Sequence, residues 1–272
     1  MTATAKLRLE NVVKRFGTTG ATTQTIAVQD FTLDVAAGEF LVIVGPSGCG
    51  KTTVLNLLAG LELPTAGIVA LDGQTIRGPG PERGVMFQDY ALFPWHTVRG
   101  NVEFGLRHGP AGAGLDAAAR ERRVRATIDL VGLAGAEGKY PHQLSGGMRQ
   151  RVALARLVAN EPDVLLMDEP LAALDAQTRI ILQEELLRIW GQDRPPADRR
   201  TVVFITHAID EAIFLADRIA VMTTHPGRLK AVIDVPLRRP RNDATRVQPE
   251  FQALAQHIWS LIRDEAYRAT VT

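Results

Sequence analysis

The 272-residue sequence predicts an α/β fold in which a mostly parallel sheet carries helices on its faces. Three observations support this prediction. Unbroken apolar runs at 40–44, 164–167 and 201–205 are typical of buried parallel strands. Segments with helical spacing lie between and after these runs, as in chains that alternate strand and helix. A glycine-rich turn joins the first run to the helix that follows it.

The N-terminal part is expected to be antiparallel. Residues 7–16 alternate apolar and polar side chains and predict a half-exposed strand, with 26–35 as its partner. A Thr- and Gly-rich loop at 17–25 connects the two. After a break at 63–67, residues 68–73 predict a short strand that ends in a turn.

The middle of the chain changes from strand to helix. Residues 84–88 predict a buried strand that ends at Gln88, and 98–160 has a helical texture, with a helix over 115–130. We therefore expect a helical subdomain at about 89–160.

The C-terminal third returns to alternating elements. The sequence predicts helices at 179–190 and 209–216, strands at 218–222 and 229–235, a solvated loop at 193–200, a basic proline-broken stretch at 236–247 and an amphipathic helix at 249–268. We expect one domain over 1–240, followed by a tail over 241–272 that contains this last helix.

Composition excludes several classes of protein. The 31 Lys and Arg residues balance 30 Asp and Glu residues, so no basic field favours a nucleic-acid partner. A single cysteine forms no internal disulfide, and the N-terminus lacks a signal-peptide pattern, which indicates a cytosolic chain. No apolar run approaches the ~18 residues that cross a bilayer. Any membrane span would have to come from other chains.

The glycine-rich turn has the pattern G-x-x-x-x-G-K-[ST] between a strand and a helix. Its glycines let backbone N–H groups surround a polyphosphate at a helix N-terminus. Lys51 would reach the β and γ phosphates, and the Thr52 hydroxyl would bind Mg²⁺. The alternative is a structural turn with a chance lysine. The predicted nucleotide-binding residues of this turn are Gly45, Pro46, Ser47, Gly48, Cys49, Gly50, Lys51, Thr52 and Thr53.

Polar residues follow three of the predicted strands. Asp168 is suited to hold Mg²⁺ and Glu169 to polarise an attacking water, although an acidic helix cap would look the same. Gln88 could touch both metal and water. Taken alone, Gln88 and His207 read more simply as hydrogen-bonded structural residues.

A second anion site is indicated at 144–151. There Ser145 and two glycines precede a helix predicted over 148–159, and the exposed N–H groups of a helix N-terminus attract an anion. The alternative is an ordinary N-cap with flexible glycines. Because the chain already has one phosphate loop, a second anion site at 144–151 is not needed for its own nucleotide.

Together these motifs resemble those of ABC transporter ATPases. Residues 45–52 resemble the Walker A motif, Gln88 the Q-loop, 144–151 the signature, 164–169 the Walker B motif and His207 the switch histidine. All five occur in the family's order, within a resemblance that covers about 7–235. It implies a P-loop NTPase core with an antiparallel β subdomain and a helical signature subdomain.

The resemblance also implies how the site is assembled. In that family two subunits pack head to tail, so Ser145, Gly146, Gly147 and Gln150 would face the ATP that Lys51 of a second copy holds. Glu169, His207 and Gln88 would be catalytic, with Mg²⁺ at Thr52, Gln88 and Asp168. Phe16 matches the aromatic residue that stacks on adenine, and Asp175 matches the D-loop aspartate. Ala172 departs from the Ser or Gly common at its position.

A finer resemblance concerns the substrate. Residues 78–84, 93–95 and 225–228 are similar to those of the taurine, sulfonate and nitrate importer branch, the first pattern to taurine ATPases in particular. This implies a homodimer on the cytoplasmic face of the membrane, with two integral-membrane permease subunits and an extracytoplasmic solute-binding protein. A soluble ABC protein that acts on nucleic acid or ribosomes, or a small P-loop kinase, is the alternative.

Two residues carry separate hypotheses. Trp95, with Phe93 and Pro94, either forms an exposed apolar cluster for a permease helix or packs inside the helical subdomain. Cys49 lies beside a helix N-terminus and Lys51, which predicts a lowered thiol pKa and a reactive cysteine; the alternative is an inert filler.

Overall fold

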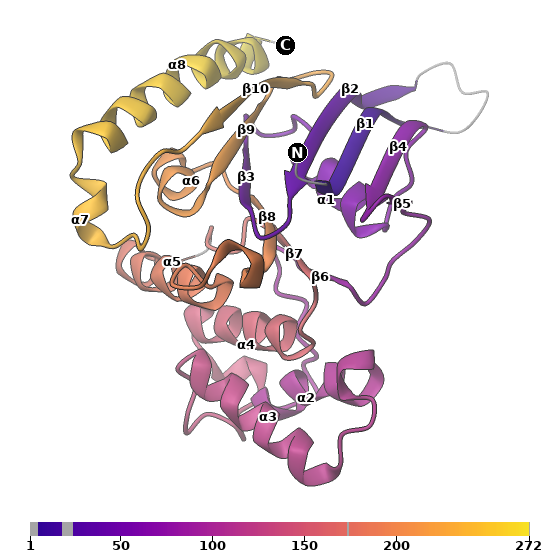
Figure 1. Ribbon diagram of the computed structural model, residues 1–272, viewed down its shortest axis with the longest axis vertical. Coiled ribbons are helices and arrows are strands. Elements are labelled where there is room, and N and C mark those ends of the chain that lie inside the picture. The colour runs from indigo at the N-terminus through magenta and orange to yellow at the C-terminus, as the bar shows by residue number, and fades with distance from the viewer. Residues whose placement is uncertain (1–4, 18–23, 173, 272) are drawn as a thin grey trace. The chain divides into compact units, whose positions relative to one another are not determined.

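The computed structural model describes residues 5–17, 24–172 and 174–271. The chain divides into two compact units (Figure 1): the first combines residues 1–79 with 186–272, and the second comprises residues 80–185. Most of the predicted loop at 17–25 lies outside the described residues. None of the helices in the described ranges has both the length and the apolar character needed to cross a bilayer.

An antiparallel sheet of four strands lies in the first unit. Its order is β2 (Thr25–Ala36), β1 (Ala5–Phe16), β4 (Ala66–Leu71) and β5 (Gln74–Thr75). Leu9 of β1 faces Leu33 on one side and Val69 on the other, and all three side chains are buried. The alternating pattern in the sequence therefore gives one buried face, as the half-exposed strand prediction requires.

The first unit also contains two of the three apolar strands predicted from the sequence. Strands β3 (Phe40–Val44), β8 (Thr201–Ile205) and β9 (Arg218–Met222) run parallel, with β3 in the middle, and β10 (Leu229–Asp234) pairs antiparallel with β9. Every residue of β3 and β8 is buried, which explains their continuous apolar sequences.

Helices cover this second sheet of the first unit. Helix α1 (Lys51–Ala59) follows β3, and α6 (Ile209–Leu215) follows β8. The chain ends in α7 (Asp243–Arg246) and α8 (Pro249–Val271), and α8 runs beside α6 and β9 (Figure 1).

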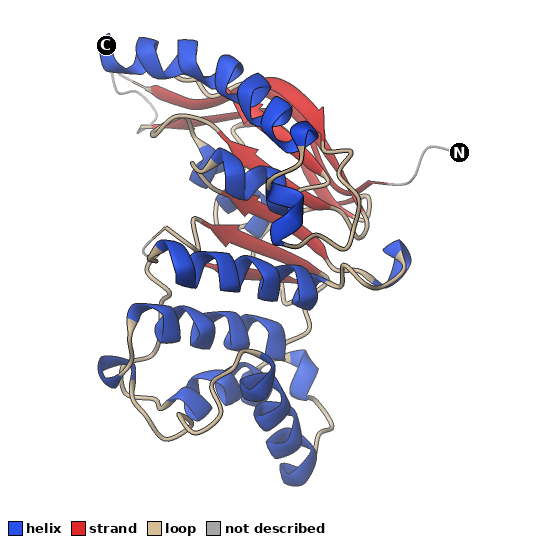
Figure 2. Ribbon diagram, turned by 90° about the vertical axis from the view of Figure 1, so that its left-hand side faces the viewer, coloured by secondary structure: helices blue, strands red, loops and turns tan. Residues whose placement is uncertain are grey.

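Helices dominate the second unit (Figure 2). Its two strands, β6 (Arg83–Met86) and β7 (Val164–Asp168), pair in parallel. Its helices are α2 (Val98–His108), α3 (Ala117–Leu130), α4 (Gly146–Ala159) and the beginning of α5 (Ala176–Trp190). These helices agree with the helical pattern predicted over 98–160. The division of the chain into a domain over 1–240 and a tail over 241–272 stays a prediction.

Three element boundaries differ from the expected ones at functional positions. Strand β6 ends at Met86, so Gln88 lies two residues beyond it. Asp168 is the last residue of β7, whereas the prediction ended that strand at Met167. Helix α4 begins at Gly146 rather than Met148. In each case the end of the element is defined by backbone hydrogen bonds, and the pattern of apolar and polar side chains does not show where these begin or end.

The basic stretch at 236–247 contains a buried arginine. Arg241 is 2% exposed, and its guanidinium donates five hydrogen bonds. Its Nη1 reaches the carbonyls of Ile213 (3.0 Å), Phe214 (3.0 Å) and Ala216 (2.7 Å), and its Nη2 reaches those of Val235 (3.4 Å) and Leu237 (3.2 Å). This guanidinium occupies the C-terminal end of α6, where carbonyls lack helical partners and a cation is favoured. The C-terminal segment is thereby tied to the first unit.

Candidate functional site

The phosphate loop connects β3 to α1 within the first unit. Gly48 and Gly50 have φ of +75° and +93°, a left-handed region that glycine adopts without strain. A Cβ at Gly50 would lie 2.8 Å from the carbonyl oxygen of Ala27 in β2. Gly50 is also the N-cap of α1 and has no side chain to satisfy the first-turn N–H groups. These N–H groups are therefore suited to an anion.

Lys51 begins α1 and bends back over the loop. Its Nζ donates to the carbonyl oxygens of Gly45 and Pro46, both at 2.9 Å. Its side chain is 6% exposed. A buried ammonium with neutral carbonyl partners favours an incoming anion, which agrees with the predicted phosphate contact.

Cys49 differs from the prediction. The side chain is completely buried, and its Sγ lies 3.8 Å from Lys51 Nζ. Burial raises the pKa of the Cys49 thiol, and this effect outweighs the opposing influence of Lys51. The lowered pKa expected from sequence is therefore wrong for this structure, because the sequence shows the neighbouring charge but not the loss of water.

His207 and the phosphate loop lie at the same edge of the parallel sheet. Strands β3 and β8 are adjacent and parallel, with Ile43 opposite Ile205, so the residues that follow each strand emerge side by side. The amide of Thr206 donates to the Ile43 carbonyl at 3.3 Å. The next residue, His207, is exposed at the surface. The first unit thus brings His207 to the edge of the sheet from which the phosphate loop starts.

Two other predicted contacts of the first unit are accessible. Phe16 ends β1 and is 42% exposed, with Lys14 Nζ 5.0 Å from the centre of its ring. An exposed aromatic face is the surface on which a base stacks. Thr52 is exposed in the first turn of α1. Their predicted roles toward adenine and Mg²⁺ fit these positions.

Asp168 and Glu169 follow directly from β7 in the second unit. Asp168 is 7% exposed, and Glu169 is partly exposed. Glu169 has φ of +44°, which is uncommon for a residue with a side chain. Backbone conformations of this kind are concentrated at functional sites, since the surrounding structure has to maintain them. Gln88 is exposed, two residues after β6, the strand next to β7.

Within the described ranges no group of three or more His, Cys, Asp or Glu side chains is placed to hold a metal ion. Mg²⁺ takes one or two protein oxygens and completes its octahedron with water and phosphate oxygens. The predicted ligands Thr52, Asp168 and Gln88 are oxygen donors of the kind that Mg²⁺ takes, and their assembly into one site stays a prediction.

The signature begins a helix in the second unit. Ser145 is the N-cap of α4 and its Oγ accepts a hydrogen bond from the Met148 amide at 3.3 Å. The two glycines differ: a Cβ at Gly146 would meet nothing within 4 Å, whereas one at Gly147 would lie 3.1 Å from Thr178 Cγ2. Gly146 therefore leaves open space for a ligand, and Gly147 permits close packing.

Asp175 lies beside the signature. A hollow of about 360 Å³ is lined by residues of the signature together with Leu174, Asp175 and Thr178. The Asp175 carboxylate accepts from the Thr178 amide at 3.0 Å, and these hydrogen bonds lower the pKa of Asp175. The second unit thus brings the predicted D-loop aspartate and the signature together. Gln150, in contrast, is 2% exposed, so burial does not favour its predicted contact with a second copy's ATP.

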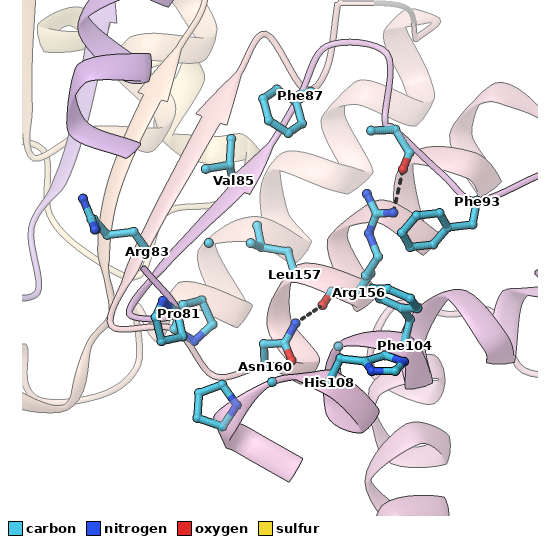
Figure 3. A pocket seen from close by; sticks show the side chains of 16 residues that line it. Pro81, Arg83, Val85, Phe87, Phe93, Phe104, His108, Arg156, Leu157 and Asn160 are labelled. Carbon is cyan, nitrogen blue, oxygen red and sulfur yellow. Dashed lines mark hydrogen bonds between the residues drawn. The ribbon is translucent and has the colours of Figure 1, made fainter. Parts of the chain in front are cut away.

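An apolar groove follows Gln88 in the same unit. The groove encloses about 550 Å³ and is lined by aromatic side chains that include Phe87, Phe93 and Phe104 (Figure 3). Trp95 is 69% exposed beside Phe93, with ring centres 5.7 Å apart. The alternative in which Trp95 packs inside the helical subdomain is therefore wrong.

Two residues that the sequence did not reveal hold this groove in shape. Asn101 is completely buried; its Oδ1 accepts from the Phe93 amide (2.9 Å), and its Nδ2 donates to three carbonyls at 3.0–3.2 Å. Arg156 donates to the carbonyls of Tyr90 (2.9 Å) and Ala91 (2.6 Å), as Figure 3 shows in part. Burial lowers the pKa of Arg156. Neither side chain belongs to a recognisable motif.

Comparison with known proteins establishes the family. A model described as ABC transporter matches residues 28–172. The chain belongs to the ABC transporter family. It is 47% identical over 264 residues to an uncharacterized ABC transporter ATP-binding protein of Methanocaldococcus jannaschii, which covers 97% of this chain and 94% of that protein.

Two further members of the ABC transporter family are similar. The nitrate import ATP-binding protein NrtD of Synechococcus elongatus is 47% identical over 231 residues, 84% of this chain and 82% of that protein. The ATP-binding cassette MJ0796, solved as a dimer in a post-hydrolysis state bound to ADP and Pi, matches with a TM-score of 0.73 and 31% identity. This match covers 84% of this chain and 98% of that one. The predicted fold class is confirmed, and the chain is an ATP-binding subunit of an ABC transporter.

Proposed function

We propose that this chain is the ATP-hydrolysing subunit of an importer for a small anion, taurine or another sulfonate. One observation most strongly supports ATP hydrolysis at a site shared by two copies. A single chain carries both a phosphate cradle, in the first unit, and a second helix N-terminus suited to an anion, at Ser145 in the second unit. Two copies arranged head to tail would each complete the ATP site of the other. A two-fold symmetric dimer meets this requirement, because each copy then presents its signature to the phosphate loop of the other.

The proposed roles follow from the chemistry of each side chain. Lys51 neutralises the β and γ phosphates, and Ser145 with the Gly146 and Gly147 amides holds the γ phosphate of the other copy. Glu169 accepts a proton from the attacking water, while His207 donates to the γ phosphate. Mg²⁺ bound at Thr52, Asp168 and Gln88 would supply charge neutralisation on the phosphates.

A Glu169→Gln variant tests the reaction. The amide keeps the shape of the side chain but cannot accept the proton, so ATP should bind with wild-type affinity while hydrolysis falls by at least about a hundredfold. Size-exclusion chromatography with light scattering should then detect an ATP-stabilised dimer. Ordinary turnover by this variant would refute the role of Glu169.

The apolar groove after Gln88 is the proposed contact with the membrane-embedded permease subunits. Its aromatic lining and the exposed Trp95 fit the apolar face of a helix, a common mode of recognition. The partners would be two integral-membrane permease subunits, and an extracytoplasmic solute-binding protein would deliver the substrate. The chain would then lie on the cytoplasmic face of the membrane.

A nitrate-type importer is the second candidate, because the similarity to the nitrate import protein favours it. Residues 78–84, which are similar to those of taurine ATPases in particular, favour the sulfonate class instead. Calorimetric titration of the proposed solute-binding protein with taurine, an alkanesulfonate and nitrate separates the two. Binding of nitrate alone would exclude the sulfonate proposal.

A further inference from the structure

A short turn at 223–228 separates β9 from β10 and is closed by its own hydrogen bonds. The amide of Thr223 donates to the carbonyl of Arg228 at 3.0 Å, and the amide of Arg228 returns to Thr223 Oγ1 at 3.1 Å. Thr223 Oγ1 also donates to the Pro226 carbonyl at 3.2 Å. These three internal hydrogen bonds fix the shape of the six-residue turn.

This turn packs directly against the phosphate loop. A Cβ at Gly227 would lie 2.1 Å from the carbonyl oxygen of Cys49. The Gly227 amide donates to Ala27 in β2 at 3.1 Å, and the Gly227 carbonyl accepts from the Gln29 amide at 2.9 Å. Since Gly50 also approaches Ala27, the turn, β2 and the phosphate loop form one layer with no room for an added methyl. A displacement of the turn therefore changes the loop.

The other side of the turn is attached to the C-terminal helix. Glu265 of α8 is 4% exposed and accepts from Lys230 Nζ at 2.9 Å. Its second carboxylate oxygen lies 3.4 Å from the Thr224 amide and 3.5 Å from Thr224 Oγ1. Lys230 Nζ also donates to the Leu261 carbonyl at 2.9 Å. A buried carboxylate is tolerated only with such partners, so these contacts fix α8 against the turn.

We infer that Glu265 is a positioning residue for the phosphate loop. It holds Thr224, the turn transmits that position through Gly227, and the backbone at Cys49 keeps the shape that binds the triphosphate. The C-terminal helix thereby sets the affinity of the chain for ATP. The inference relies on the proposed nucleotide role of this loop and adds a control of that role by α8, a segment without any recognised motif.

A Glu265→Gln variant tests this connection. Direct titration with Mg-ATP should show a Kd raised about two- to thirtyfold, the range that residues along a coupled contact path produce. Gly227→Ala should weaken binding further in the same direction, since it displaces the Cys49 carbonyl. Glu250→Gln is the matched control: it removes an exposed carboxylate from the same helix and should keep the wild-type Kd.

A smaller change separates positioning from folding. Thr224→Val removes the hydroxyl contact to Glu265 without changing charge, and it carries the test alone if Glu265→Gln does not fold. The two substitutions should be non-additive in the Kd for ATP, because they interrupt the same contact. The melting temperature of each nucleotide-free variant is measured in parallel.

Two results would overturn the inference. If Glu265→Gln and Thr224→Val lower the melting temperature but bind Mg-ATP like the wild type, Glu265 only packs the helix. If the wild-type chain and Glu250→Gln also fail to bind Mg-ATP, the proposed nucleotide role of the loop is wrong, and the inference that depends on it is wrong too. The two failures are thus distinguished in one set of titrations.

Discussion

Replacing Arg241 with methionine tests whether the C-terminal segment belongs to the core of the first unit. Methionine keeps the apolar stem and removes a guanidinium that donates to five carbonyl oxygens, three of them from residues 213–216. The substitution leaves neutral carbonyl oxygens without their donor, and a buried unsatisfied acceptor costs about 1–3 kcal/mol. Burial, with repulsion from Arg239, lowers the pKa of Arg241 to about 9. The cost of removing the guanidinium from water therefore offsets part of the free energy that its five hydrogen bonds contribute to folding. We expect a loss of about 3 kcal/mol in the free energy of unfolding.

Urea unfolding of the nucleotide-free chain measures this loss. Arg238→Met is the matched control, because Arg238 is exposed in the same segment, and it should change the free energy by less than about 0.5 kcal/mol. A loss near 3 kcal/mol is a large part of the ~5–15 kcal/mol that stabilises a typical domain. If Arg241→Met is destabilised by no more than Arg238→Met, the five hydrogen bonds do not hold the tail as described.

Two further predictions concern reactivity and the membrane partner. Because Cys49 is buried and its thiol pKa is raised, maleimide should label it at least about tenfold more slowly than a cysteine placed at exposed Ser260, with or without Mg-ATP. Mass spectrometry gives both rates, and equal rates would contradict the burial. Trp95→Ala should weaken co-purification with the permease while the Kd for Mg-ATP stays at the wild-type value. Unchanged permease recovery would argue against docking at the groove.

Much of the fold could be predicted because its signals are local. Continuous apolar runs identified β3, β7 and β8, and alternation identified β1 and β2. The phosphate loop was recognisable because glycines, a lysine and a hydroxyl are required at fixed spacing. Each of these features depends on residues within about ten positions of one another.

The features that sequence did not reveal depend on contacts between distant residues. Arg241 looks like any charge in a basic stretch until the carbonyls at the end of α6 are placed around it. Gly147 and Gly146 are identical letters, yet only Gly147 packs against Thr178. The thiol of Cys49 was misjudged for the same reason, since neighbouring charge is visible in a sequence and burial is not.

The sharing of each ATP site between two copies is tested most directly by mixing two inactive variants. Lys51→Ala should lose ATP binding, whereas Ser145→Arg should bind ATP normally and fail to hydrolyse it. An equal mixture forms mixed dimers with one intact site, so hydrolysis should reappear at about a quarter of the wild-type rate. Wild-type hydrolysis by Ser145→Arg alone, or no recovery in the mixture, would contradict a site completed by the second copy.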